Sequence, residues 1–216
     1  LRAAGAAVAA TDAVIDGEVD NAFCSVRPPG HHATRGQAMG FCFFNNAAVA
    51  ARYAQEKYGI DRVAIIDFDV HHGNGTQDIF WDDPSVMYCS THQMPLYPGS
   101  GDASETGEAN TIVNVPLPPG ENGAGFKEAF EVVLLPRLDG FAPELVIISA
   151  GFDAHARDPL GGLNLVEADF AWATRALMDV ADKHSDGRVV SVLEGGYDLE
   201  GLARSTAAHV MTLMTG

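Results

Sequence analysis

Apolar runs of strand length alternate with helix-like segments along most of the chain. The runs cover residues 63–68, 86–90, 111–115, 145–150 and 189–193, and a further short one covers 22–26. They show little polar alternation, which indicates strands that are buried on both faces of a mostly parallel sheet. The sequence therefore predicts an α/β fold with three layers (α/β/α), in which helices flank the central sheet.

Helical patterns fill the segments between these runs. An Ala-rich helix is expected over residues 1–15, and others over about 124–139, 166–184 and 200–214. Asn45 and Asn46 can cap a further helix that continues to about Tyr58, where Gly59 ends it. Without repeats or a long linker, residues 1–216 are expected to form one domain. The chain begins at Leu1 rather than Met, which suggests a fragment.

Composition narrows the functional classes. The net charge of -16 argues against a nucleic-acid surface, which needs a basic patch. It would suit cationic substrates, and it equally fits a generally acidic solvated surface. No apolar run is long enough to span a bilayer, so no membrane association is expected. The three cysteines, Cys24, Cys42 and Cys89, are odd in number and lie among apolar residues. They are expected to be reduced core residues of a cytoplasmic protein.

Unusual polar residues follow the apolar runs. Asp67-Phe-Asp-Val-His-His follows the first long run, and Ser90-Thr-His follows the second. Gly151-Phe-Asp and Glu194-Gly-Gly-Tyr come directly after the runs at 145–150 and 189–193. Open α/β sheets bind their ligands beyond the carboxyl ends of the strands. The sequence thus predicts one functional site at that edge of the sheet.

Asp69, His71 and Asp153 are the candidate metal ligands of this site. Residues two apart in an extended strand end point to the same side, so Asp69 and His71 can face one cation. Asp153, at the end of another strand, is the natural third ligand. Two carboxylates, one histidine and an open position are typical of a catalytic zinc site, and ferrous iron suits the same ligands.

His31, His32 and Tyr197 are the candidate catalytic residues. The two histidines follow Pro-Pro-Gly, a stiff turn, and different partners would separate their pKa values. Asp67 is the expected partner of one ring, and the neutral Asn74 of the other. A phenol at Tyr197, opposite a metal ion, would stabilise an oxyanion in amide hydrolysis.

Aromatic residues on glycine-flanked loops are expected to form the walls of a narrow channel. The candidates are Phe41, which follows Gly40, and Tyr97, which precedes Pro-Gly-Ser-Gly. Phe43 and Phe44 are instead expected to be ordinary core residues.

Six segments, taken together, resemble the histone deacetylase family within the arginase–deacetylase superfamily. They are Arg27-Pro-Pro-Gly-His-His-Ala, Gly40-Phe-Cys-Phe-Phe-Asn-Asn, Asp67-Phe-Asp-Val-His-His-Gly-Asn-Gly, Tyr97-Pro-Gly-Ser-Gly, Gly151-Phe-Asp-Ala-His and Glu194-Gly-Gly-Tyr. They occur in the family's order and cover nearly the whole chain from about residue 22. Asn74 and Glu194 make the resemblance strongest to class II and bacterial members. The family normally has a further N-terminal portion, which the chain is expected to lack.

The resemblance implies a zinc-dependent hydrolase that cleaves the amide of acetyl-lysine, or of a related acylated amine such as an acetylated polyamine. The zinc ligands would be Asp69, His71 and Asp153. His32 would move the proton, His31 would stay charged beside Asp67, and Tyr197 would bind the oxyanion. The walls of the acyl-chain tunnel would include the residues Gly40, Phe41 and Tyr97, with Leu160 at the rim.

The resemblance also implies structural potassium. One site would use Asp67, Asp69, His71, Ser90 and Thr91. A second site would use mainly backbone carbonyl groups near Phe80, Asp83 and Val86.

Three alternatives remain open. A binuclear manganese ureohydrolase of the same superfamily would need further carboxylates, but Gly73 and His155 occupy those positions. A second alternative is an inactive fragment that serves as a binding module. The third keeps the mechanism and replaces acetyl-lysine by acetylated polyamines or other small acyl amines. Leu160 provides no acidic residue at the rim, where one would favour polyamines.

Overall fold

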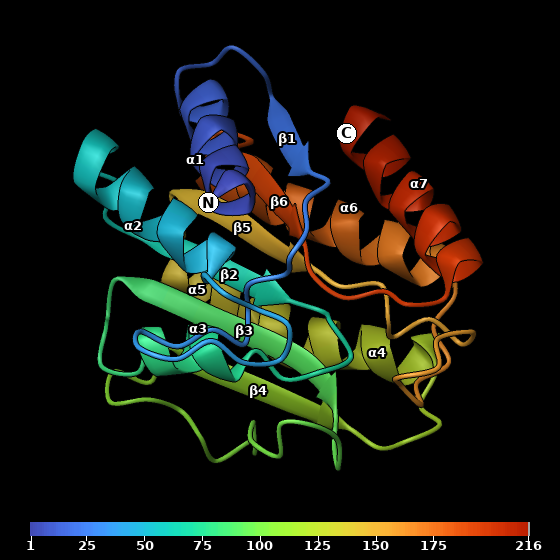
Figure 1. Cartoon of the computed structure of the whole chain (residues 1–216). Coiled ribbons are helices and arrows are strands. Elements are labelled where there is room, and N and C mark those ends of the chain that lie inside the picture. Colours follow the sequence, from blue (N-terminus) through green and yellow to red (C-terminus); the bar gives the residue numbers. More distant parts are fainter. Residues whose placement is uncertain (216) are drawn as a thin grey trace.

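One parallel sheet forms the centre of the protein, as the computed structural model describes it for residues 1–215 (Figure 1). Its six strands lie in the order β1-β6-β5-β2-β3-β4, and every neighbouring pair is parallel. The strands are β1 (Asn21–Cys24), β2 (Val63–Asp67), β3 (Val86–Gln93), β4 (Ile112–Leu117), β5 (Leu145–Ala150) and β6 (Val189–Leu193). The predicted α/β class and parallel sheet are confirmed.

Helices cover both faces of this sheet. They are α1 (Arg2–Ile15), α2 (Asn46–Tyr58), α3 (Asn74–Ile79), α4 (Gly123–Ala129), α5 (Leu135–Phe141), α6 (Glu167–His184) and α7 (Leu199–Thr215), and a π-helical turn, η1 (Phe130–Leu134), joins α4 to α5. Asn45 caps α2 by accepting a hydrogen bond from the backbone N–H of Ala48 at 3.0 Å, and Gly59 ends it in the left-handed region (φ 68°). Both were expected from the sequence.

Alternate residues of the central strands belong to two separate cores. Val63 and Ile65 of β2 pack with α1 and α2, whereas Ala64 and Ile66 pack with the helices from α4 to α7. Such two-sided burial explains why the strands read as continuous apolar runs. The result is the predicted three-layer arrangement (Figure 1).

Several boundaries differ from the sequence prediction. β3 continues three residues beyond the expected end at Ser90, to Gln93, where the chain pairs with β4 up to Leu117. The short helix α3 was not predicted, because its six residues are too few to show a helical period. Phe43 and Phe44, which were expected in the core, are 68% and 48% exposed.

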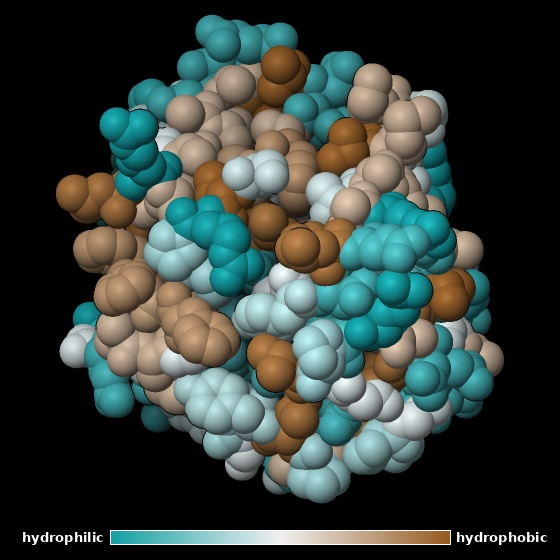
Figure 2. Space-filling model, turned by 45° about the vertical axis from the view of Figure 1, so that its right-hand side comes forward, coloured by the Kyte–Doolittle hydropathy of each residue, from teal (hydrophilic) through white to brown (hydrophobic). Residues whose placement is uncertain are grey.

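The three cysteines are free and buried, as expected. Within residues 1–215, no helix has the length and apolar character needed to cross a membrane. Hydrophilic and hydrophobic side chains are interspersed over the face seen in Figure 2.

Phe170→Ala should lower the free energy of unfolding by about 3–5 kcal/mol, because Phe170 is fully buried among large side chains. Its ring lies 5.9 Å from that of Phe68 and 5.3 Å from that of Phe152, measured between centroids. Phe68 and Phe152 directly precede the predicted metal ligands Asp69 and Asp153. Urea unfolding would measure the loss, with Val132→Ala, an exposed residue, as control. A loss below about 1 kcal/mol would contradict this view of the core.

Candidate metal centre and active site

The carboxyl ends of three neighbouring strands bring the predicted site residues together. Asp67 ends β2 and is followed by Asp69 and His71, and Asp153 comes three residues after β5. Glu194 directly follows β6. Since β6, β5 and β2 lie side by side in the sheet, these segments converge at one edge.

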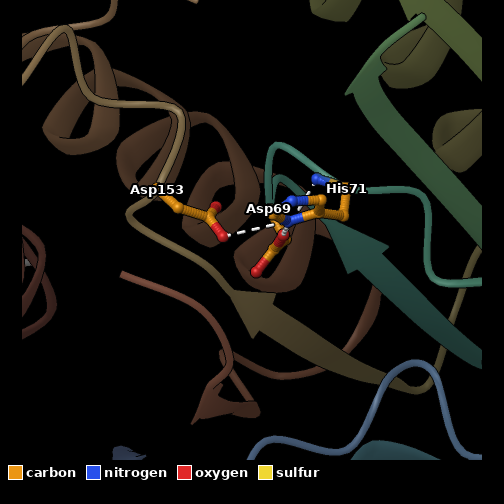
Figure 3. A group of neighbouring side chains, drawn as sticks. All are labelled: Asp69, His71 and Asp153. Carbon is orange, nitrogen blue, oxygen red and sulfur yellow. Dashed lines mark hydrogen bonds and ion pairs between the residues drawn. The ribbon is translucent and has the colours of Figure 1, made fainter. Parts of the chain in front are cut away.

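Asp69, His71 and Asp153 form a compact group that could hold a metal ion (Figure 3). One ligand atom from each lies within 4.8 Å of the others. Nδ1 of His71 is 3.0 Å from Oδ1 of Asp69 and 3.2 Å from Oδ2 of Asp153. All three residues are buried, so their donor atoms converge away from bulk water.

Backbone amides orient the two carboxylates. Asp69 accepts hydrogen bonds from the N–H of His71 (2.9 Å) and from that of Gly195 (2.8 Å), and Asp153 accepts one from Val70 (2.8 Å). Gly195 must be glycine, because a Cβ there would lie 2.1 Å from Oδ2 of Asp153. The chain thus packs closely around these oxygens and fixes where they point.

The charges of this group favour a bound cation. Burial, and then the charge of Asp69, raise the pKa of Asp153 to about 7. For His71, burial alone would lower the pKa, but hydrogen bonds to Asp153 and Asp69 raise it to about 10. Two buried carboxylates are costly without a positive partner. Two oxygen donors and one nitrogen donor suit zinc or another divalent transition metal.

His31 and His32 lie beside this group with different partners. Nδ1 of His31 is 2.9 Å from Oδ2 of Asp67, and Nδ1 of His32 is 2.8 Å from Oδ1 of Asn74. Both pairings were expected from the sequence. The two rings lie 4.0 Å apart between centroids, and both are buried.

The two imidazoles differ strongly in basicity. Burial alone would lower the pKa of His31, but the charges of Asp67 and Asp69 raise it well above its usual value. Burial, together with the charge of His31, lowers the pKa of His32 to about 3. His31 is therefore held as a cation, and His32 as a neutral ring that can accept a proton.

Tyr197 lies on the loop after β6. Burial and the charges of Asp69 and Asp153 raise the pKa of its phenol, which keeps the O–H as a hydrogen-bond donor. Its backbone N–H donates to Oδ2 of Asp158 at 2.7 Å. Asp158 also accepts from Asp198 (3.1 Å) and Leu160 (3.0 Å).

A pocket of about 440 Å³ leads to the metal group. It is lined by the four predicted channel residues, Gly40, Phe41, Tyr97 and Leu160. His71 and Leu96 complete the lining. Phe41, Tyr97 and Leu160 are 66%, 47% and 44% exposed, which fits walls of an open pocket. A larger hollow of about 700 Å³ lies over α2 and contains none of the predicted site residues.

The residues of the expected potassium sites lie around the ends of β2 and β3. Asp67 and Ser90 are register partners in the sheet, and Ser90 Oγ is 2.9 Å from Nδ1 of His92. The hydroxyl of the neighbouring Thr91 is buried without a hydrogen-bond partner among the described residues. Phe80 and Asp83 lie between α3 and β3, and Val86 begins β3.

Gly73 and His155 occupy the two positions where a binuclear manganese site would need further carboxylates. A Cβ at Gly73 would lie 2.4 Å from both Asp67 Oδ2 and the hydroxyl of Tyr88, so any side chain would collide there. Nδ1 of His155 accepts a hydrogen bond from the backbone N–H of Arg157 at 3.2 Å. Within residues 1–215, the group of Asp69, His71 and Asp153 is the one cluster with metal-ligand spacing.

The sequence did not predict three hydrogen-bonding roles near the site, although it did place Glu194 at this edge of the sheet. Tyr88 donates its hydroxyl to Oδ2 of Asp67 (3.0 Å), Asp158 holds the backbone of Tyr197, and Glu194 accepts from Gly30 and His31. The signal for Tyr88 was a phenol hydroxyl in the middle of the mainly apolar run 86–90. Asp158 and Glu194 gave a weaker signal, because acidic residues in loops are usually solvated.

Residues 1–213 match the histone deacetylase domain. The chain belongs to the histone deacetylase family. It is similar to a probable deacetylase of Archaeoglobus fulgidus, at 44% identity over 219 residues, covering 100% of this chain and 61% of the relative. The mouse polyamine deacetylase HDAC10 is 47% identical over 222 residues, covering 98% of this chain and 33% of that protein.

A histone deacetylase-like amidohydrolase of Pseudomonas aeruginosa is 46% identical over 198 residues, covering 90% of this chain and 52% of the relative. The crystal structure of the HDA15 HD domain superposes with a TM-score of 0.92 at 43% identity, covering 99% of this chain and 61% of that one. The chain thus spans about a third to three fifths of the length of these relatives. The likeness to the HDA15 HD domain confirms the expected deacetylase fold.

Proposed function

We propose that this chain is a zinc-dependent deacetylase that hydrolyses the amide of an acetylated amine to acetate and a free amine. One observation carries the proposal: a pocket with aromatic walls reaches His71, a member of the metal group. A neutral imidazole, His32, and a phenol, Tyr197, lie near the same group. The family membership supports amide hydrolysis, and the relatives named deacetylase or amidohydrolase support it further.

Asp69, His71 and Asp153 would hold the zinc ion through two oxygens and one nitrogen. Zinc with three protein ligands polarises a carbonyl group and makes water acidic near neutral pH. Ferrous iron in the same ligands is the second candidate. Potassium bound near Asp67, Ser90 and Thr91 is a further part of the proposal, and the unpartnered Thr91 hydroxyl supports it.

His32 is the proposed general base. Asn74 presents its Oδ1 to Nδ1 of His32, so Nδ1 carries the hydrogen and Nε2 keeps a lone pair. In the proposed reaction, Nε2 takes a proton as water adds to the acetyl carbon. It gives this proton to the amine nitrogen when the C–N bond breaks, so that the amine leaves neutral.

His31 and Tyr197 are the proposed electrostatic partners. The pairing of His31 with Asp67 keeps a positive charge beside His32. The Tyr197 O–H donates to the carbonyl oxygen as it becomes negative. The aromatic side chains of Phe41 and Tyr97 would enclose the acyl-bearing chain and exclude water, with Leu160 at the rim.

An acetylated lysine side chain or an acetylated polyamine is the proposed substrate. Both present an acetamide at the end of an aliphatic chain. The methylene groups of such a chain suit a pocket whose walls include the side chains of Phe41, Leu96 and Tyr97.

 The mouse relative is named a polyamine deacetylase, which supports the second candidate. An acetylated polyamine keeps its unacetylated ammonium groups, so the net charge of -16 would also favour its approach. An inactive binding module is the alternative function.

Release of acetate tests the proposal. Protein purified without chelator and loaded with zinc should release acetate from acetyl-lysine peptides, from acetylpolyamines, or from both. Tyr197→Phe, which lacks only the hydroxyl, should lower kcat by about 10²–10³-fold and leave zinc bound. If the zinc-loaded protein releases acetate from no member of the panel, the binding module becomes the better explanation.

A further inference from the structure

Glu194 is a buried carboxylate next to the proposed catalytic centre, yet it is not one of the three candidate metal ligands. It is 0% exposed and directly follows the last residue of β6. Its Oε2 accepts hydrogen bonds from the backbone N–H groups of Gly30 (2.6 Å) and His31 (3.1 Å). Its Oε1 accepts one from the hydroxyl of Ser149 on β5 (3.1 Å). Both oxygens therefore have partners.

We propose that Glu194 is a positioning residue. Its carboxylate fixes the backbone segment that carries His31 and His32 in its place relative to the metal ligands. The proposal rests on the proposed deacetylase function. Two successive backbone N–H groups donate to one carboxylate oxygen, and such hydrogen bonds are strengthened by the negative charge of the acceptor. Without the carboxylate, these buried amides would lose their hydrogen-bond partner, which is unfavourable for a backbone N–H away from water.

The other side of this segment is fixed as well. The carbonyl oxygen of His31 accepts hydrogen bonds from the N–H groups of Gly75 (3.0 Å) and Thr76 (3.1 Å) in α3. A Cβ on Gly30 would lie 2.4 Å from the backbone nitrogen of Asn46, so the chain also packs tightly against the start of α2. Glu194 anchors the segment to the edge of the sheet, where the metal ligands also lie.

The residues that follow β6 link Glu194 to the metal group and to Tyr197. Gly195, the next residue, donates its N–H to Asp69 at 2.8 Å, and Tyr197 follows two residues later. The carboxylate thus ties the proposed base to the same strand end that fixes a metal ligand. Misplacing a reacting group by about 1 Å can cost about 10²-fold in rate.

Two substitutions separate position from charge. In Glu194→Gln, the amide oxygen can still accept from Gly30 and His31, and its NH₂ can donate to Ser149. Glu194→Ala removes all three bonds. We expect kcat per bound zinc to fall about 10²-fold in Glu194→Ala with KM and zinc content little changed. Glu194→Gln should restore most of kcat. Glu128→Ala, at an exposed glutamate, is the matched control.

Hydrogen exchange of the metal-free protein provides a readout that does not depend on activity. The amides of Gly30 and His31 should exchange faster in Glu194→Ala than in the wild type, and at nearly the wild-type rate in Glu194→Gln. Wild-type kcat per bound zinc in Glu194→Ala would overturn the proposal. So would equal losses of kcat in both variants, since charge rather than position would then matter. If the wild type releases no acetate but the amides of Gly30 and His31 exchange as expected, the proposed deacetylase function is wrong. The role of Glu194 in fixing the segment is then still supported.

Discussion

Asp153→Asn is expected to abolish tight zinc binding while the protein remains folded. Asp153 lies buried in the metal group, with Oδ2 at 3.2 Å from Nδ1 of His71, and the substitution keeps its shape. Losing even an outer partner of a metal ligand costs about 10–100-fold in affinity, so losing an anionic ligand should cost more than about 100-fold. Zinc per chain after dialysis, and the Kd from competition with a chelator, would measure the loss.

Thermal unfolding adds a second readout with a defined sign. Burial raises the pKa of Asp153 from 3.8 to about 7, so its contribution to stability is lost as pH rises through that range. At pH 8 the metal-free Asp153→Asn protein should therefore be at least as stable as the metal-free wild type. Added zinc should raise the Tm of the wild type and leave the Tm of the variant nearly unchanged.

Asp182→Asn is the matched control, because Asp182 is exposed on α6. It should bind about one zinc per chain, as the wild type should. An Asp153→Asn protein that binds zinc with wild-type affinity would contradict the assignment of Asp153 as a ligand.

The sequence predicted the fold well because the strands are buried on both faces. Residues 63–66 include no polar position before the site residue Asp67, and this pattern is typical of a strand in a covered parallel sheet. The structure confirms β2 at Val63–Asp67 and β5 at Leu145–Ala150. Short elements gave less signal. The six residues of α3 are fixed by their contacts, including the hydrogen bonds from Gly75 and Thr76 to His31, rather than by periodicity.

The cluster of site residues was also predictable in large part. Polar residues at the ends of apolar runs must meet at one edge when the strands are parallel, and Asp69, His71 and Asp153 do meet there. The pairings of His31 with Asp67 and of His32 with Asn74 are likewise present. The roles assigned to these residues remain predictions.

Hydrogen bonds between residues far apart in the sequence were not predictable from local patterns. Glu194 and Gly30 are 164 residues apart in the sequence, and no spacing rule links them. Phe43 and Phe44 show the opposite error: their apolar character suggested the core, but the chain turns them outward beside the hollow over α2. Which apolar residues face solvent depends on the path of a loop, and glycine-flanked loops have few local constraints on that path.

His32→Gln is expected to lower kcat by about 10²–10⁴-fold, with zinc content and KM little changed. The physical reason is the lone pair on Nε2. Because Oδ1 of Asn74 accepts from Nδ1 at 2.8 Å, the neutral ring presents Nε2 as its only basic atom. Glutamine can keep the hydrogen bond to Asn74, but its amide has no group that can take and return a proton.

Steady-state acetate release and metal analysis of the same samples would measure both expected results. His184→Gln is the matched control, since His184 lies on α6, where Nε2 is 2.7 Å from Oδ1 of Asp139. It should leave kcat within about twofold, as expected for a substitution outside the strand-end cluster. If His32→Gln kept more than about a tenth of the wild-type kcat, the ring would not be the general base. The charge of His31 would then have to act without a proton-transfer partner, and water activation would depend on the metal group alone.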